Sequence, residues 1–222
     1  MNITFIYTDL PFWRAEIGRI ALHVGGVAFE DRRISREEFG RVKANGTLDD
    51  GTVVPFRQIP SLVVDGTSIA QTGGISRVCG KLSGLYPTDD IIQCALVDQV
   101  IDMMTDITVL LGPSNAESDP EKKKQMRLDL VGGALAKKIG YLEEQIVRDG
   151  DGWSVGDRMT IADIAVWRLF GWLTAGTIDH LPTDLIAPFP NLRRVCAKVG
   201  QHPKVLAWIK MNYPKDYPLG NF

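Results

Sequence analysis

The chain has 222 residues, of which 45% are hydrophobic and 23% charged. This composition is typical of folded globular proteins and differs from that of disordered, collagen-like or disulfide-rich chains. Lys and Arg together number 25 against 27 Asp and Glu, for a net charge of −2, so the chain lacks the basic excess that binds phosphate backbones. We therefore expect no nucleic-acid partner. The sequence shows no secretory leader and no run of 18 apolar residues, which predicts a cytoplasmic protein with no membrane partner.

The first eighty residues have a mixed α and β pattern. Two β-prone runs flank one amphipathic helical pattern, at residues 3–7, 14–24 and 27–33. This order predicts a βαβ unit. Further on, residues 61–64 and 67–69 flank the turn dipeptide Asp65-Gly66, which predicts a hairpin and hence a mixed sheet.

Beyond residue 89 the pattern is helical throughout. Apolar residues recur at steps of three and four in two long segments and three shorter ones, at residues 91–111, 120–147, 161–173, 191–198 and 203–210. A stretch containing Gly and Pro separates this region from the first. We predict a first domain of residues 1–82, a linker of residues 83–89 and an all-α domain of residues 90–222.

Cysteine and histidine are few and scattered. They lie at Cys79, Cys94, Cys196, His23, His180 and His202, with no spacing typical of metal ligands. We therefore expect reduced thiols and no metal site.

Two segments suggest a ligand site. Gln58-Ile59-Pro60 stands directly before the hairpin, where a proline that is cis, as in thioredoxin-like folds, frees the preceding backbone for an extended peptide. Gln71-Thr72 stands at the start of a helix, where side chains and free amides favour a carboxylate. The alternatives are a trans-proline at a strand start and a plain helix cap at Thr72.

Taken together, these segments resemble the cytosolic glutathione transferases of the sigma, mu, alpha and pi group, and most closely the sigma-like members. The resemblance covers the whole chain and is carried by the motifs Arg14-Ala15-Glu16-Ile17, residues 31–43, residues 55–60 (PFRQIP) and residues 156–163 (GDRMTIAD). It implies a thioredoxin-like N-terminal domain with a four-stranded mixed sheet, followed by an all-helical domain. It also implies a homodimer with glutathione as co-substrate and a role in detoxification.

The GDRMTIAD motif has a structural explanation that needs no family. The Thr160 side chain can accept from the Asp163 backbone N–H while the Asp163 side chain accepts from the Thr160 N–H, which is a capping box. The carboxylates of Asp157 and Asp163 then serve the start of a helix, not acid–base chemistry.

The resemblance assigns a role to each residue of the glutathione site. Tyr7 would donate to the thiolate sulfur and lower the thiol pKa, with Arg14 beside it. The remaining glutathione contacts would be Gln71 and Thr72 at the γ-glutamyl end, Ile59 and Pro60 at the cysteinyl unit, Gln58, Lys43 and Phe39 at the glycyl end, and Asp102 from the partner subunit. Apart from the resemblance, we expect the apolar side chains of Phe12, Trp13 and Met104 to border a pocket for the second substrate.

Three departures from the group affect this assignment. Six residues separate Tyr7 from Arg14, one more than usual, so an alignment anchored on Arg14 places Thr8 in the catalytic position. Phe39 stands where the group has Trp. Residues 44–54 form an insertion with a turn at Asp50-Gly51, which we expect to be a mobile flap beside the glycyl end.

The predicted activity is attack of the glutathione thiolate on a soft, hydrophobic small-molecule electrophile. Isomerisation of a substrate by the same thiolate, as in sigma-like prostaglandin D synthases, is one alternative. A catalytically silent binding or structural protein of the same family is the other.

Overall fold

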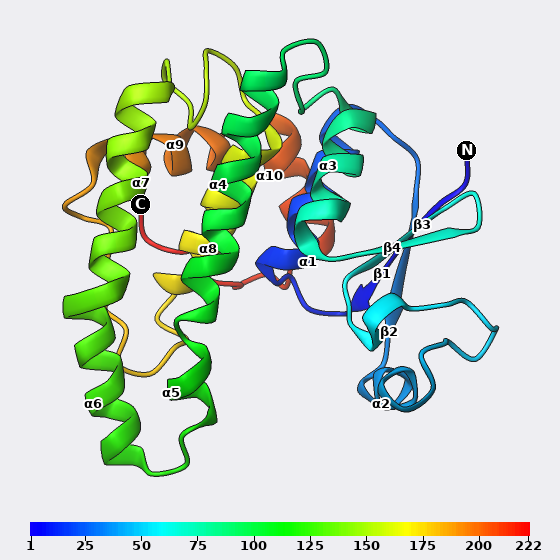
Figure 1. The fold of residues 1–222 in the computed structure, drawn as a ribbon, viewed down its shortest axis with the longest axis horizontal. Helices are drawn as coiled ribbons and strands as arrows, with labels where there is room; N and C mark the ends of the chain where they lie inside the picture. Colours follow the sequence, from blue (N-terminus) through cyan, green and yellow to red (C-terminus); the bar gives the residue numbers. More distant parts are fainter. The chain divides into compact units, whose positions relative to one another are not determined.

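A computed structural model describes all residues, 1–222 (Figure 1). The chain divides into two compact units, Met1–Tyr86 and Pro87–Phe222, called the N-terminal unit and the C-terminal unit below. The predicted linker, residues 83–89, spans this division. None of the helices is both long enough and apolar enough to cross a membrane.

The N-terminal unit contains a four-stranded mixed sheet. In chain order the strands are β1 (Ile3–Thr8), β2 (Glu30–Ile34), β3 (Ser61–Val64) and β4 (Thr67–Ala70). They lie in the order β2-β1-β3-β4, with β1 parallel to β2 and antiparallel to β3, and β3 antiparallel to β4. The predicted βαβ unit and hairpin are confirmed. The second strand begins later than predicted because Gly26 turns the chain with a φ of 70° and residues 27–29 lead into Glu30.

Helices cover both faces of this sheet (Figure 1). They are α1 (Trp13–Gly25), α2 (Arg36–Asn45) and α3 (Thr72–Ser83), with a short 3-10 turn at Pro55–Arg57. On one face Phe5 packs against Gly18 of α1, where an added Cβ would lie 2.5 Å from the Phe5 ring. On the other face Ile6 belongs to an apolar cluster with Ile34, Val42, Leu48 and Val54. Side chains alternate between faces along a strand, so Phe5 and Ile6 are buried on opposite sides.

The insertion at residues 44–54 is anchored, which corrects our expectation of a mobile flap. Leu48 and Val54 are buried in the apolar cluster below β1, and the Leu48 N–H donates to the Thr52 carbonyl at 2.9 Å. Gly51 has a φ of 86°, so the predicted turn is present. Apolar side chains inside the insertion hold it on the sheet, and burial of such residues stabilises the folded loop.

The C-terminal unit is entirely helical. Its helices are α4 (Ile91–Val109), α5 (Gly112–Ala116), α6 (Pro120–Leu130), α7 (Ala136–Asp149), α8 (Ile161–Leu173), α9 (Pro190–Gly200) and α10 (Pro203–Asn212). The helical prediction is confirmed, with one difference in the second long segment. There a π-helical segment at Val131–Leu135 joins α6 to α7, and Gly133 departs from helical geometry with φ −119° and ψ −107°.

The core of the C-terminal unit is built around α8. Every residue of α8 except Trp172 is buried, as expected for a helix that is apolar on all sides. The predicted capping box is present at its start. The Asp163 carboxylate accepts from the backbone N–H groups of Thr160 and Ser154, each at 2.7 Å, and from the Thr160 hydroxyl at 3.0 Å. Asp163 therefore holds both the helix start and the preceding loop, which supports a structural role.

Candidate functional site

Tyr7 lies near the end of β1, with 9% of its surface exposed. Alternation along the strand puts it on the same face as Phe5. Burial raises the pKa of Tyr7 to about 12, although the nearby charges of Arg14 and Arg19 act in the opposite direction. The phenol therefore keeps its proton at neutral pH and can donate a hydrogen bond.

Arg14 connects Tyr7 to the start of α3. It occupies the first turn of α1, and its Nη1 donates to the Thr72 hydroxyl at 3.2 Å. Its guanidinium also lies over the Trp13 ring, 4.7 Å from the centroid. Because Arg14 also interacts electrostatically with Tyr7, one cation links the ends of three elements: β1, α1 and α3.

The start of α3 differs from a plain helix cap. Gln71 is the N-cap residue, and Thr72, the first helical residue, is buried with its hydroxyl bonded to Arg14. Gln71 has φ 69° and ψ 128°, a backbone region that L residues rarely adopt. Strained residues of this kind gather at ligand sites. The exposed Gln71 side chain and the free amides of the first turn of α3 thus form one polar surface.

The Gln58-Ile59-Pro60 segment leads directly into β3, an inner strand of the sheet. The Ile59–Pro60 peptide bond is cis, and the antiparallel pairing of β3 with β1 begins at Ser61, opposite Ile6. Ile59 therefore lies just outside this ladder, and Gln58 before it is exposed.

Two of the residues predicted for the glycyl end, Phe39 and Lys43, lie on α2. The Lys43 ammonium is 4.7 Å from the centroid of the Phe39 ring, and Phe39 is half-buried against the apolar cluster. Arg57, which our sequence reasoning missed, donates to the carbonyls of Lys43 at 3.3 Å and Ala44 at 2.8 Å. Arg57 keeps a φ of 53°, a left-handed backbone conformation that usually selects glycine.

The prediction of the electrophile pocket needs correction. Trp13 and Met104 have 0% exposed surface, so neither side chain is available to a ligand in this structure. Both belong to the buried faces of their helices, with Ile17 and Ile20 in α1 and with Val100 and Ile107 in α4. Phe12 is only half-buried, and its ring packs edge-on against Trp13 with centroids 6.3 Å apart.

Asp102, predicted to reach the site of a partner subunit, lies on α4 between buried neighbours. Ile101 and Met104 are buried, whereas Asp102 itself is exposed. Its role in a second subunit stays a prediction.

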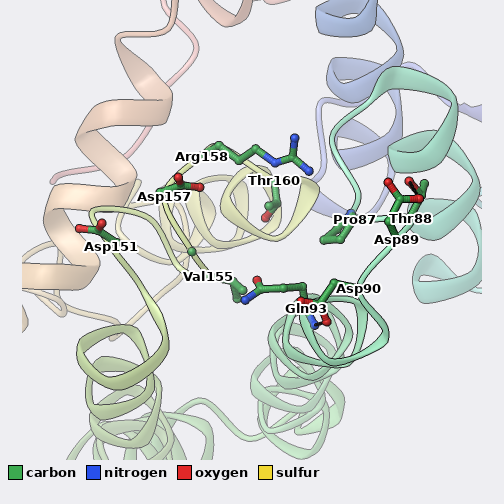
Figure 2. Close-up of a pocket in the computed structure, with 11 residues that line it drawn as sticks. Pro87, Thr88, Asp89, Asp90, Gln93, Asp151, Val155, Asp157, Arg158 and Thr160 are labelled. Atoms are coloured by element: carbon green, nitrogen blue, oxygen red, sulfur yellow. Dashed lines mark hydrogen bonds between the residues drawn. The ribbon is translucent and has the colours of Figure 1, made fainter.

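A pocket of about 470 Å³ lies in the C-terminal unit, between the start of α4 and the loop before α8. Carboxylates and one guanidinium line it, from Asp89, Asp90, Asp151, Asp157 and Arg158. Figure 2 shows these carboxylates spread around the opening without converging. No group of three or more His, Cys, Asp and Glu side chains in the structure could hold a metal ion. The pocket thus offers no arrangement of reacting groups like that of Tyr7, Arg14 and Thr72.

Comparisons with known proteins agree with the fold. Residues 102–212 match the family "Glutathione S-transferase, C-terminal domain". Glutathione S-transferase 2 of Caenorhabditis elegans is 32% identical and covers 68% of this chain and 78% of its own length. Glutathione S-transferase 1 of Ascaris suum is 27% identical over 87% of this chain and 89% of its own.

The solved structures lead to the same class. Prostaglandin synthase D of Nilaparvata lugens has a TM-score of 0.80 and 25% identity, covering 96% of this chain and 99% of its own. A four-stranded mixed sheet with a cis-proline, followed by an all-helical unit, defines the two-part architecture of the cytosolic glutathione transferases. This chain belongs to the glutathione S-transferase family.

Proposed function

We propose that the protein is a glutathione transferase that joins the glutathione thiolate to soft, hydrophobic electrophiles. The observation that carries the proposal is the link from Tyr7 through Arg14 to Thr72, made by the 3.2 Å hydrogen bond and the electrostatic coupling described above. This link places a protonated phenol and a cation beside the polar surface at the start of α3. Such a surface suits a ligand that has both a thiol and carboxylates.

In the proposed mechanism Tyr7 is the thiolate partner. Its phenol, protonated because burial raises its pKa, donates to the sulfur and favours the anion over the thiol. The positive charge of Arg14 favours the same anion. The thiolate then attacks the electrophile, and binding both reactants in one orientation supplies the remaining acceleration.

Tyr7, and not Thr8, is favoured as the donor by the geometry of β1. Both residues lie in the strand, so their side chains point to opposite faces. Arg14 interacts with Tyr7, and Arg19 on the same helix lies over the Tyr7 ring. Those cations mark the Tyr7 face as the one that favours a thiolate.

The anchors of glutathione follow from the same unit. Gln71 and Thr72 hold the γ-glutamyl end, the backbone of Ile59 beside Pro60 pairs with the cysteinyl unit, and Gln58 and Lys43 hold the glycyl carboxylate. Phe39 supplies an aromatic surface under Lys43 in place of an indole donor. We further propose a cytoplasmic homodimer that acts in detoxification, with Asp102 of one subunit reaching the γ-glutamyl amine held by the other.

Isomerisation is the second candidate function. The likeness to prostaglandin synthase D of Nilaparvata lugens, at a TM-score of 0.80, favours it. Both reactions use the same thiolate, so the second substrate that the protein accepts distinguishes conjugation from isomerisation. A panel of conjugation substrates assayed beside an endoperoxide substrate distinguishes the two.

Calorimetry with glutathione and titration of the bound thiol test the proposal. We expect glutathione to bind the intact protein, and Tyr7→Phe to keep that affinity while raising the thiol pKa. Loss of a donor to developing charge slows turnover by up to about 2.7–4 kcal/mol in activation free energy. Thr8→Val is the matched control and should change little. Undetectable binding at millimolar glutathione contradicts the proposal, and exchanged phenotypes of the two variants would assign the donor to Thr8.

A further inference from the structure

A buried arginine lies against the ring of Tyr7, and no step of the proposed mechanism uses it. Arg19 is on α1 and is 1% exposed. Its guanidinium carbon is 5.7 Å from the centroid of the Tyr7 ring and 5.6 Å from that of Phe5. Both distances are within the range of a cation–π contact, and such contacts strengthen when water is excluded.

Two carboxylates fix the position of this guanidinium. Nη1 of Arg19 donates to Glu16 at 3.1 Å, and Nε donates to Asp31 at 2.8 Å. Nη2 is buried and has no hydrogen-bond partner. The two ion pairs hold the planar guanidinium in one orientation. Its remaining close neighbours are the aromatic rings of Phe5 and Tyr7.

The network continues from Asp31 to the loop that follows β1. Asp31 also accepts from Nε of Arg33 at 2.9 Å, and Nη1 of Arg33 donates to Asp9 at 2.5 Å. Arg33 stands opposite Tyr7 in the pairing of β2 with β1. Asp9 begins the loop that contains the extra residue between Tyr7 and Arg14. One chain of ion pairs therefore ties this loop to the cation against Tyr7.

We propose that Arg19 is a positioning residue for the reaction, acting through Tyr7. It holds the Tyr7 ring in one orientation and polarises the phenol so that the O–H is a stronger donor to a nearby anion. Glu16 and Asp31 carry the opposing charge, which keeps the guanidinium in place, although the charge of Glu16 acts on the pKa of Tyr7 in the direction opposite to that of Arg19. This inference rests on the proposed function, because it gives Arg19 a role only if Tyr7 is the thiolate partner.

Arg19→Lys is the first test because it keeps the positive charge but loses the planar guanidinium that bonds both Glu16 and Asp31. A second variant, Arg19→Met with Glu16→Gln, removes the cation without leaving Glu16 as an unpaired buried charge. Arg41→Lys is the matched control, since Arg41 also bonds two carboxylates, Glu37 and Asp49, but on the surface. Each variant is made in the wild-type and the Tyr7→Phe background.

Arg19→Lys should lower kcat with a small-molecule electrophile about tenfold, the scale of a desolvated cation–π contact. It should raise the pKa of the bound thiol and leave the KM for glutathione unchanged. In the Tyr7→Phe background the same substitution should leave kcat unchanged, because the ring no longer carries the donor. Arg41→Lys should match the wild type in both backgrounds.

Two results would overturn the inference: wild-type kcat in both Arg19 variants, or an equal loss in both backgrounds. Titration of the phenol in ligand-free protein covers the remaining case. If Tyr7→Phe alone keeps full turnover, the role proposed for Tyr7 is wrong. If an Arg19 variant leaves the pKa of the Tyr7 phenol unchanged, Arg19 does not act on Tyr7. A variant that fails to fold is identified by circular dichroism, and the other Arg19 variant then decides.

Discussion

The two units differ in where their backbones are strained and where their polar groups are buried. In the N-terminal unit Phe56, Arg57 and Gln71 all have positive φ, and they are exposed around the predicted glutathione site. In the C-terminal unit the helix α8 is buried almost throughout, and its one acidic residue, Asp163, has all its hydrogen bonds inside the unit. Strain costs free energy, and stably packed surroundings must sustain it.

This contrast indicates that the N-terminal unit binds the ligand and that the C-terminal unit mainly contributes stability. Polar side chains around the predicted glutathione site face places where a ligand can satisfy them, whereas the buried carboxylate of Asp163 is satisfied by groups of its own unit. Substitutions in the first unit should therefore change binding and chemistry, and substitutions in the second should change stability. The substitutions below test whether binding and stability separate between the two units in this way.

The largest effect is expected at Asp163. Asp163→Ala removes the acceptor of two buried backbone N–H groups, and leaving such groups unsatisfied should cost about 3 kcal/mol or more of unfolding free energy. Turnover of the folded fraction should be unchanged. Denaturant unfolding and an activity assay measure the two quantities. Asp157→Ala, at an exposed position in the same motif, is the control, and a loss of turnover at full stability would contradict the comparison.

The next effect concerns the stability of the N-terminal unit at high pH. The raised pKa of Tyr7, about 12, means that the folded state holds this proton more tightly than the unfolded state does. The contribution is complete below pH 10 and is lost as the pH rises toward 12, by about 3 kcal/mol in total. Unfolding of wild type and Tyr7→Phe between pH 9 and 12 measures it. Parallel curves would show that Tyr7 ionises like an exposed phenol.

Gln71 should give a binding effect without a matching loss of stability. Gln71→Ala removes a hydrogen bond to a charged ligand and should weaken glutathione binding by roughly 1.5–3 kcal/mol. Gln71→Gly should weaken binding equally, yet the protein should be more stable than the Ala variant by about 1 kcal/mol because Gly accepts a positive φ. Calorimetry and thermal unfolding separate the two. Equal stability of the variants would mean that the Gln71 backbone relaxes.

The effect expected at Asp102 is small, and it is the one that would contradict this separation of the two units. If it reaches the amine of a glutathione in a partner subunit, a residue of the C-terminal unit takes part in binding. Asp102→Ala should then weaken glutathione binding by about 1 kcal/mol, the scale of an exposed ion pair, whereas Asp98→Ala on the same helix should not. Light scattering should show a dimer. A monomer with unchanged affinity in Asp102→Ala would mean that only the N-terminal unit binds glutathione.

The sequence predicted those features that depend on local patterns. Period-two and period-3.6 patterns located the strands and helices, and the spacing of Thr160 and Asp163 predicted the cap. The same patterns could not say whether Trp13 and Met104 face a core or a pocket, since both environments select apolar side chains. Burial in the structure decides for the core.

Other features depended on contacts between distant residues. The insertion looked polar and mobile because its turn residues dominate the sequence, but Leu48 and Val54 anchor it on residues of β1 and α2. The positive φ of Gln71 had no signal, because Gln is not the residue that such a backbone usually selects. Likewise, the helical pattern did not distinguish Arg19 from the other arginines, because its contact with Tyr7 forms only in the folded chain.

The π-helical segment between α6 and α7 has a consequence for how the length of this chain can change. Eight positions separate the buried Arg127 from the buried Leu135, whereas a regular α-helix returns to the same face after seven. The wider turn at Val131–Leu135 takes up the additional residue, so both side chains stay buried. A deletion of Gly132 or Gly133 would restore the spacing of seven and give one continuous α-helix with the same buried face. The C-terminal unit can therefore lose one residue within Val131–Leu135 while the same side chains of α6 and α7 stay buried in the core.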